Sequence, residues 1–140
     1  DVSDSPQTVS LADVDAARAI HDTAGAGVVR HTPVVPAAAL SGALGRQVVY
    51  KADNLQTTGS FKIRGALNKV ASLGTTARAG VTAGSAGNHA QALAYAARHF
   101  QVPCEIFVPA GAPVVKRSLA VWVLLELVSR MPRSSRSSGS

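Results

Sequence analysis

Aromatic residues and cysteine are scarce in this chain, and each scarcity argues against a class of protein. The 140 residues include one tryptophan, two tyrosines and three phenylalanines, so few side chains could stack on nucleic-acid bases. Cys104 is the single cysteine and has no disulfide partner in the chain, which favours a reducing cytoplasm. The longest apolar run, Val121 to Val128, is interrupted by Glu126 and is too short to span a membrane. We therefore expect neither nucleic acid nor a membrane among the partners.

Charge and composition leave a globular protein as the expected class. The formal net charge is +6, and residues 119–140 supply +2 of it, from three arginines against one glutamate. Because the basic residues are scattered, this charge suits anionic small molecules as well as nucleic acid. Hydrophobic residues make up 46% of the chain, which is enough for a packed core. A nucleic-acid binder driven by the basic tail stays as a hypothesis.

Composition divides the chain into three parts. Residues 1–10 are polar and are expected to form a flexible lead-in. Residues 11–118 carry the apolar patterns of one domain. Residues 119–140 depart from them: six of the last twelve residues are serine, and arginine, proline and glycine fill much of the remainder. We expect this divergent tail to be disordered.

Apolar periodicity and turn residues predict alternating helices and strands. Ser60 is expected to cap a helix that ends at Gly74 and has its inward face at Ile63, Ala66, Leu67 and Val70. A helix capped by Asn88 is expected to have its inward face at Ala90, Leu93, Ala94 and Ala97. Further helices are predicted from Leu11 to about Gly25 and over 37–44, and strands over 47–51, 79–83 and 104–108. This alternation predicts an α/β protein, with a parallel sheet joined by crossover helices.

Lys62 occupies an unusual place for a lysine. It would lie in the first turn of its helix, where unpaired N–H groups disfavour a nearby positive charge. Burial against Phe61 and Ile63 would favour the neutral amine further, and a neutral amine can attack an aldehyde. The alternative is a surface lysine that covers apolar helix surface with its stem. The residues alone leave both readings open.

A second motif, SAGNHAQ at residues 85–91, is a small-residue turn between a strand and a helix. Its backbone N–H groups, Ser85 and Asn88 could bind an anion such as a carboxylate at the helix N-terminus. An ordinary turn with an asparagine cap is the alternative, and His89 could be a structural turn histidine. Since His89 has no second ligand at metal-binding spacing nearby, no metal is predicted.

These segments together resemble a known enzyme group. Residues 51–66 read KADNLQTTGSFKIRGA, residues 85–103 read SAGNHAQALAYAARHFQVP and residues 30–40 read RHTPVVPAAAL. They closely resemble the threonine dehydratase (threonine ammonia-lyase) and serine dehydratase group, over about Leu11 to Lys116. The resemblance implies the two-domain tryptophan-synthase-β-like fold of pyridoxal-phosphate enzymes (fold type II), of which residues 11–118 are an incomplete, N-terminal part of the catalytic domain. It also implies pyridoxal 5'-phosphate as the cofactor.

The resemblance further implies roles for individual residues. Lys62 is the lysine that binds the cofactor covalently and later acts as the base at the α-carbon of the substrate. Phe61 packs beside the cofactor and Asn88 contacts its ring hydroxyl. The substrate carboxylate is bound by side-chain and backbone donors of Ser85, Gly87, Asn88 and His89.

The implied reaction is β-elimination, in which threonine or serine yields a 2-oxo acid and ammonia. Related racemases carry a serine where this chain has Ala86, and alanine cannot deliver a proton, so elimination is favoured over racemisation. The alternatives are another β-eliminating or a β-replacing pyridoxal-phosphate enzyme, and an inactive, non-catalytic remnant. The resemblance also implies a role in amino-acid metabolism, in isoleucine biosynthesis, and homo-oligomers among full-length relatives.

The chain departs from the group in two ways. Asp53 stands where members commonly have glutamate, and Thr57 stands where they often have proline. The group's glycine-rich phosphate loop, and the small polar residue that faces the pyridine nitrogen, lie downstream of the position of Lys116 and have no counterpart in this sequence. We therefore expect a fragment, produced by truncation or by a shifted reading frame in the gene.

Overall fold

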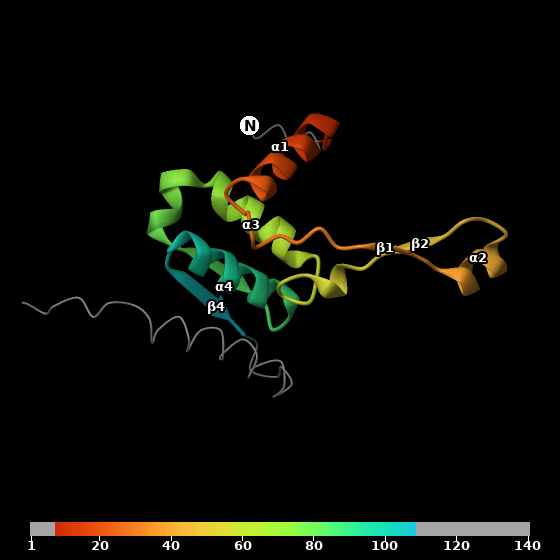
Figure 1. Ribbon diagram of the computed structural model, residues 1–140. Coiled ribbons are helices and arrows are strands. Elements are labelled where there is room, and N and C mark those ends of the chain that lie inside the picture. The colour runs from red at the N-terminus through yellow and green to blue at the C-terminus, as the bar shows by residue number, and fades with distance from the viewer. Residues whose placement is uncertain (1–7, 109–140) are drawn as a thin grey trace, which may run out of the picture.

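The computed structural model describes residues 8–108 of the chain. The predicted tail, residues 119–140, and most of the predicted lead-in, residues 1–10, lie outside the described residues. The elements follow in the order α1 (Leu11–Asp22), β1 (Val34–Pro36), α2 (Ala38–Leu44), β2 (Val49–Lys51), the 3₁₀ turn η1 (Asp53–Leu55), α3 (Lys62–Ser72), the 3₁₀ turn η2 (Gly74–Ala79), β3 (Val81–Gly84), α4 (Asn88–Phe100) and β4 (Cys104–Phe107). Figure 1 shows a body, formed by the elements from α3 to β4, and an arm, formed by β1, α2 and β2.

A capping box begins α1. The Ser10 hydroxyl accepts the Asp13 N–H at 3.2 Å, and the Asp13 carboxylate accepts the Ser10 N–H at 2.8 Å. The hydrogen bond from the Ser10 backbone, followed by one from its hydroxyl, holds the pKa of Asp13 below its ordinary value. Because orphan groups at the helix start are satisfied in this way, the chain turns into a helix at Leu11, as predicted.

The helices α3 and α4 pack face to face in the body. All the inward positions predicted for the two helices are buried: Ile63, Ala66, Leu67, Val70, Ala90, Leu93, Ala94 and Ala97. Alanines on α4 leave room for the larger side chains of α3, so Ile63, Leu67 and Val70 fill the space between the helices. The apolar periodicity therefore predicts this packing correctly.

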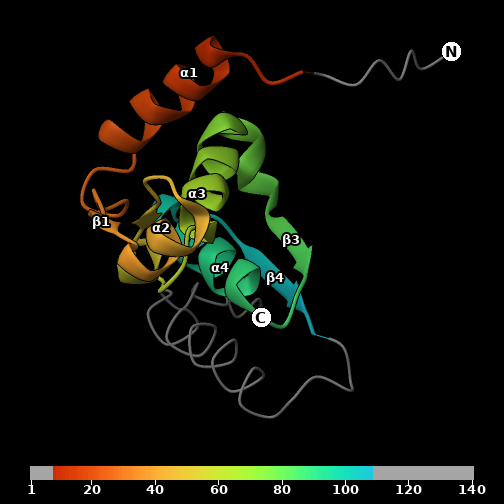
Figure 2. The same ribbon diagram turned by 90° about the vertical axis from the view of Figure 1, so that its right-hand side faces the viewer.

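The strands β3 and β4 pair in parallel, with Val81 opposite Cys104 and Gly84 opposite Phe107. Figure 2 shows α4, which connects them, packed beside both strands. This confirms the predicted parallel pair with a crossover helix. The strand β3 begins at Val81 rather than at residue 79, because residues 74–79 form η2, in which Ala77 joins the core.

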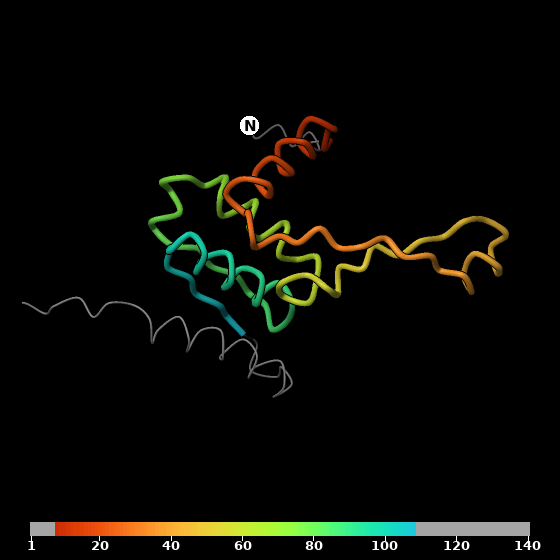
Figure 3. The backbone as a smooth tube through the Cα atoms, viewed as in Figure 1, coloured from red at the N-terminus to blue at the C-terminus, as the bar shows by residue number. Residues whose placement is uncertain are grey.

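The arm departs from the predicted parallel arrangement. β1 and β2 pair antiparallel, with Val34 opposite Lys51 and Pro36 opposite Val49. No strand is predicted over residues 34–36, because β1 has only three residues and forms by pairing with β2. The helix predicted over 37–44 is confirmed as α2, and Gly45 ends it in the left-handed conformation with φ +59°. Figure 3 shows the arm as a long hairpin that points away from the body.

Two smaller predictions concern Cys104 and membrane spans. Cys104 is a free thiol on β4, and burial raises its pKa above the ordinary value, which disfavours the reactive thiolate. Within residues 8–108, no helix combines the length and the apolar character that crossing a bilayer requires.

Candidate functional site

A groove with a volume of about 490 Å³ lies between α3, β3 and the start of α4. This volume is typical of small-molecule sites. Four polar side chains line it: Lys62, Lys69, Thr82 and His89. The rest of the lining is apolar or glycine and consists of Phe61, Gly65, Ala66, Val70, Leu73, Gly80, Val81 and Leu93.

Lys62 is the first residue of α3 and is exposed to solvent. Its Nζ lies 4.9 Å from the centroid of the Phe61 ring, a cation–π distance, and Phe61 itself is 58% exposed. The expectation that Lys62 is buried against Phe61 and Ile63 is therefore wrong. Successive residues of an α-helix are rotated by about 100°, so the face that buries Ile63 against α4 leaves Lys62 free to face the groove.

The turn that precedes α3 also differs from the prediction. The N-cap is Phe61 rather than Ser60, and Phe61 has no polar side-chain atom that could accept a helix N–H. Gly59 adopts φ +71° and donates its N–H to the Gln56 carbonyl at 2.8 Å, so the chain turns just before Ser60. Ser60 is buried, and its hydroxyl and that of Thr58 have no hydrogen-bond partner among residues 8–108.

The SAGNHAQ motif connects β3 to α4. Gly87 is the N-cap of α4 and Asn88 is the first helical residue, so the prediction that Asn88 caps the helix is wrong. The Ser85 hydroxyl accepts the Gly87 N–H at 3.2 Å, so Ser85 closes the turn instead. The Ser85 N–H donates to the Phe107 carbonyl at 3.0 Å, which ties this turn to β4. Asn88 and His89 are exposed at the helix N-terminus, where free N–H groups favour an anion.

The groove brings together three residues singled out by the sequence analysis: Phe61, Lys62 and His89. The other three predicted residues belong to the adjoining turn and do not line this groove: Ser85, Gly87 and Asn88. The part of the chain between residues 8 and 108 contains no group of three or more His, Cys, Asp or Glu residues that could hold a metal.

An ion pair that the sequence analysis does not single out joins α3 to η1. Arg64 Nε lies 3.0 Å from Asp53 Oδ2, and Arg64 Nη2 lies 3.1 Å from Asp53 Oδ1. The hydrogen bond from Arg64 is the main cause that lowers the pKa of Asp53 to about 2; burial opposes it, while the Thr32 hydroxyl and the charge of Lys51 add to it. The two residues are 11 positions apart across a turn, a spacing that no helical or strand period connects.

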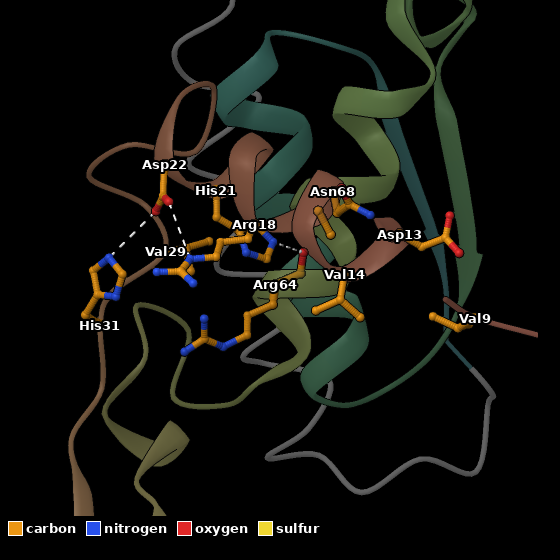
Figure 4. Close-up of a pocket in the computed structure, with 11 residues that line it drawn as sticks. Val9, Asp13, Val14, Arg18, His21, Asp22, Val29, His31, Arg64 and Asn68 are labelled. Carbon is orange, nitrogen blue, oxygen red and sulfur yellow. Dashed lines mark hydrogen bonds and ion pairs between the residues drawn. The ribbon is translucent and has the colours of Figure 1, made fainter. Parts of the chain in front are cut away.

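A second groove, with a volume of about 590 Å³, lies between α1, residues 29–31 and α3 (Figure 4). The Asp22 carboxylate lies 3.7 Å from His31 Nε2 and 3.9 Å from Arg18 Nε. His21 Nε2 lies 2.9 Å from the backbone carbonyl oxygen of Arg64. This last contact joins the final turn of α1 to the first turn of α3.

Comparison with known proteins identifies the family. Residues 26–121 match the family described as pyridoxal-phosphate dependent enzyme. The L-threonine ammonia-lyase of Thermotoga maritima is 47% identical over 104 residues, which cover 71% of this chain and 26% of that protein. The L-threo-3-hydroxyaspartate ammonia-lyase of a Pseudomonas species is 47% identical over 91 residues, which cover 64% of this chain and 28% of that protein.

A solved structure shares the fold. The crystal structure of serine racemase from Dictyostelium discoideum matches with a TM-score of 0.72 at 36% identity, over 82% of this chain and 37% of that chain. The chain spans about a quarter of the length of the curated relatives that it matches. The predicted fold, a partial α/β domain of the type II pyridoxal-phosphate enzymes, and the predicted cofactor are confirmed at the level of the family. This chain belongs to the pyridoxal-phosphate dependent enzymes.

Proposed function

We propose that this chain carries the cofactor-binding lysine of an ammonia-lyase that converts threonine or serine into a 2-oxo acid and ammonia. The observation that carries the proposal is the position of Lys62, an exposed amine on the wall of a groove that also contains His89. An accessible amine in a groove of this size can condense with the aldehyde of a small molecule. Two curated relatives at 47% identity are named as ammonia-lyases, which supports elimination as the reaction type.

The residues around Lys62 fit pyridoxal phosphate. Gly65 lines the same groove, and a Cβ placed on it would meet no described atom within 4 Å, so this wall leaves space beside the amine. Phe61 offers an exposed aromatic ring next to Lys62, against which the cofactor ring is proposed to pack. Asn88, exposed at the start of α4, is proposed to contact the ring hydroxyl of the cofactor.

Pyridoxal phosphate, when bound, withdraws electrons and so acidifies the α-proton of an amino acid. The amine of Lys62 is proposed to take this proton from the α-carbon of the substrate. The substrate carboxylate is proposed to lie at the N-terminus of α4, near Ser85, Gly87, Asn88 and His89. Since the Gly87 N–H already donates to Ser85, the Ser85 hydroxyl hydrogen and the exposed side chains of Asn88 and His89 are the groups proposed to bind it.

Ala86 supports elimination rather than racemisation. It stands between Ser85 and Gly87, at the position where the resemblance places the serine of related racemases. Racemisation needs a second group that delivers a proton to the opposite face of the α-carbon, and a methyl side chain carries no exchangeable proton. We therefore propose an elimination, with a hydroxyl as the group that leaves the β-carbon.

The proposal extends to the setting of the enzyme. We propose a reducing cytoplasm, a role in isoleucine biosynthesis for the threonine reaction, and a homo-oligomer for the full-length form. A non-catalytic remnant is the alternative, and it differs from the enzyme in predicting that added pyridoxal phosphate gives no chromophore and leaves Lys62 unlabelled.

The experiment titrates the 140-residue chain with pyridoxal phosphate, records absorption spectra, reduces with borohydride and maps the labelled peptide. We expect the label on Lys62 and its loss in Lys62→Ala. Lys69→Ala is the matched control, because Lys69 lies on the same helix and lines the same groove. A label on another residue, or a label that persists in Lys62→Ala, contradicts the assignment; an unlabelled wild-type chain favours the remnant.

A product assay separates the reaction types. The chain loaded with pyridoxal phosphate, and not reduced with borohydride, is incubated with L-threonine and with L-serine, and 2-oxo acid, ammonia and D-serine are measured. Elimination produces 2-oxo acid and ammonia in equal amounts, whereas D-serine as the main product would show racemisation and contradict the argument from Ala86.

A further inference from the structure

Arg64 lies two residues after Lys62, and its side chain binds the segments that precede α3. Its guanidinium makes two hydrogen bonds to the Asp53 carboxylate, at 3.0 and 3.1 Å, and Nη2 lies 3.3 Å from the Arg30 carbonyl oxygen. The Thr32 hydroxyl donates to the same carboxylate. The Arg64 and Asp53 side chains are 29% and 16% exposed, so most of this contact is shielded from water. One side chain thus connects η1 and residues 30–32 to the first turn of α3.

The backbone of Arg64 takes part in a further contact. Its carbonyl oxygen lies 2.9 Å from His21 Nε2, and Figure 4 shows His21 reaching from α1 toward α3. The last turn of α1 therefore meets the helix at the same residue. Three separate segments of the N-terminal half converge on Arg64: the end of α1, residues 30–32, and η1.

The loop between η1 and α3 is held to the same segment by other side chains. The Gln56 amide donates to the Arg30 carbonyl at 2.6 Å and accepts the Arg30 N–H at 3.1 Å, as a neighbouring strand would. The Thr57 hydroxyl donates to the Val28 carbonyl. Residues 56–57 are thus hydrogen-bonded to residues 28–30. Arg64 connects these two segments to α3 through Asp53 and the Arg30 carbonyl.

Lys62 depends on this arrangement more than a lysine in a capped helix would. Phe61 cannot cap the helix start, because its side chain has no polar atom. The contact that the structure shows for the exposed Lys62 amine is with the Phe61 ring, at 4.9 Å from its centroid. The place of its amine is therefore set by where the first turn of α3 lies. Arg64 belongs to that turn, and its charged two-pronged contact is both directional and strong.

We propose that Arg64 is a positioning residue for Lys62: its ion pair with Asp53 fixes the first turn of α3 against the preceding loop and so places the Lys62 amine for reaction with the cofactor. This inference rests on the proposed function, since it assumes that Lys62 binds pyridoxal phosphate. Arg64 does not line the groove that contains Lys62, so it acts through the backbone of α3.

The test measures the rate at which pyridoxal phosphate bonds to Lys62, by absorption and by borohydride trapping with peptide mapping, at a temperature where circular dichroism shows each variant folded. We expect Arg64→Gln and Asp53→Asn to slow the bond by about tenfold or more, because small displacements of a reacting group have large effects on rate. Arg64→Lys keeps the charge but not the two-pronged geometry, so a smaller slowing, of about threefold, is expected.

Two controls separate positioning from general destabilisation. Val102→Ala truncates a core side chain that lines neither groove, so it lowers stability without touching the Arg64 contacts, and its bonding rate is expected to stay within about twofold of wild type. The acetylation rate of Lys62 relative to Lys69, measured in the same molecules without cofactor, is expected to change by less than about twofold, because both amines stay exposed.

Each outcome decides between the proposals. If Arg64→Gln and Asp53→Asn bond the cofactor at the wild-type rate, or slow it no more than Val102→Ala does, Arg64 is not a positioning residue although Lys62 retains its role. If the wild-type chain bonds the cofactor elsewhere or not at all, the proposed function fails and this inference fails with it. If Arg64→Gln does not fold, Arg64→Lys and Asp53→Asn supply the same comparison.

Discussion

The body and the arm are built from the same kinds of residue but are held together differently. In the body, Ile63 and Leu67 have no exposed surface, and the apolar faces of α3 and α4 cover each other. In the arm, apolar side chains on both strands and on α2 remain 39–59% exposed: Val34, Val35, Leu40, Leu44, Val49 and Tyr50. Figure 1 shows why, since the body elements lie against one another while the arm extends alone.

Hydrogen bonds give the arm its shape. The Ala37 N–H donates to the Val48 carbonyl at 2.9 Å, and the Ser41 hydroxyl accepts the Val48 N–H at 2.9 Å. Strands of three residues and a helix of seven are too short to be stable alone in water, so such bonds supply little net stability. An apolar pattern therefore stabilises a segment only where another surface packs against it.

The largest expected effect comes from the same substitution made in each region. Leu67→Ala removes a fully buried side chain from the body and is expected to lower the free energy of unfolding by about 2–5 kcal/mol. Leu44→Ala, in the arm, removes a side chain that is 57% exposed and is expected to change it by less than about 0.5 kcal/mol. Urea unfolding followed by circular dichroism measures both, and equal losses would contradict the contrast between body and arm.

A pair of glycines gives the next largest effect. A Cβ on Gly25 would lie 2.8 Å from Leu67 Cδ2, so Gly25→Ala is expected to overpack the core and lower the free energy of unfolding by about 1–3 kcal/mol. A Cβ on Gly42, in α2, would meet no described atom within 4 Å, so Gly42→Ala is expected to leave this free energy unchanged or raise it by up to about 1 kcal/mol. Thermal unfolding of the two variants checks the sign of each change, and a destabilised Gly42→Ala would mean that the arm is more tightly packed than its exposure indicates.

The ion pair at the junction of arm and body predicts a pH dependence. The pKa of Asp53 is lowered from 3.8 to about 2 in the folded chain, chiefly by Arg64, so its contribution to stability is complete above about pH 4 and is lost as the pH falls toward 2. At pH 7, Asp53→Asn is expected to lower the free energy of unfolding by about 1–2 kcal/mol, and this gap should close at low pH.

Urea midpoints for wild type and Asp53→Asn, measured between pH 2 and pH 7, test that dependence. Asp15→Asn, on the exposed surface of α1, is the matched control and should change the free energy by less than about 0.5 kcal/mol throughout. A gap between wild type and Asp53→Asn that is constant with pH would rule out the carboxylate charge as its source.

The smallest expected effect concerns a hydrogen bond inside the arm. Ser41→Ala removes the acceptor of the Val48 N–H, so hydrogen exchange of that amide is expected to quicken by about 2- to 10-fold. The unfolding midpoint should stay unchanged, because the body does not depend on this bond. Exchange at the Val70 amide, in the buried face of α3, serves as the internal reference; if it quickens equally, arm and body unfold as one unit.

Local pattern predicts the buried faces of α3 and α4 better than it predicts which residues cap these two helices. The buried face of α3 follows from its 3.6-residue period, which the body satisfies by placing α4 against it. Ser60 and Asn88, by contrast, have the right residue types for N-caps, yet Phe61 and Gly87 take that position. Capping depends on the path of the preceding turn, which contacts elsewhere in the chain decide.

The candidate site, too, is only partly predictable from the sequence. The motifs around Lys62 and His89 indicate two residues of a reactive site, and the structure brings those two residues to one groove. The sequence does not predict the role of Arg64, because its partner Asp53 lies across a turn and their spacing matches neither a helical nor a strand period. The expected burial of Lys62 fails because side chains adjacent in sequence point in different directions on a helix.

Local interactions, encoded by residues a few positions apart, settle which segments become helices, where α1 begins and which faces turn inward. These interactions join residues within one or two helical turns of each other, so the sequence alone predicts them. The antiparallel pairing of β1 with β2 and the convergence of three segments on Arg64 arise only in the folded chain. They depend on contacts between distant segments, whose geometry exists only once those segments pack together.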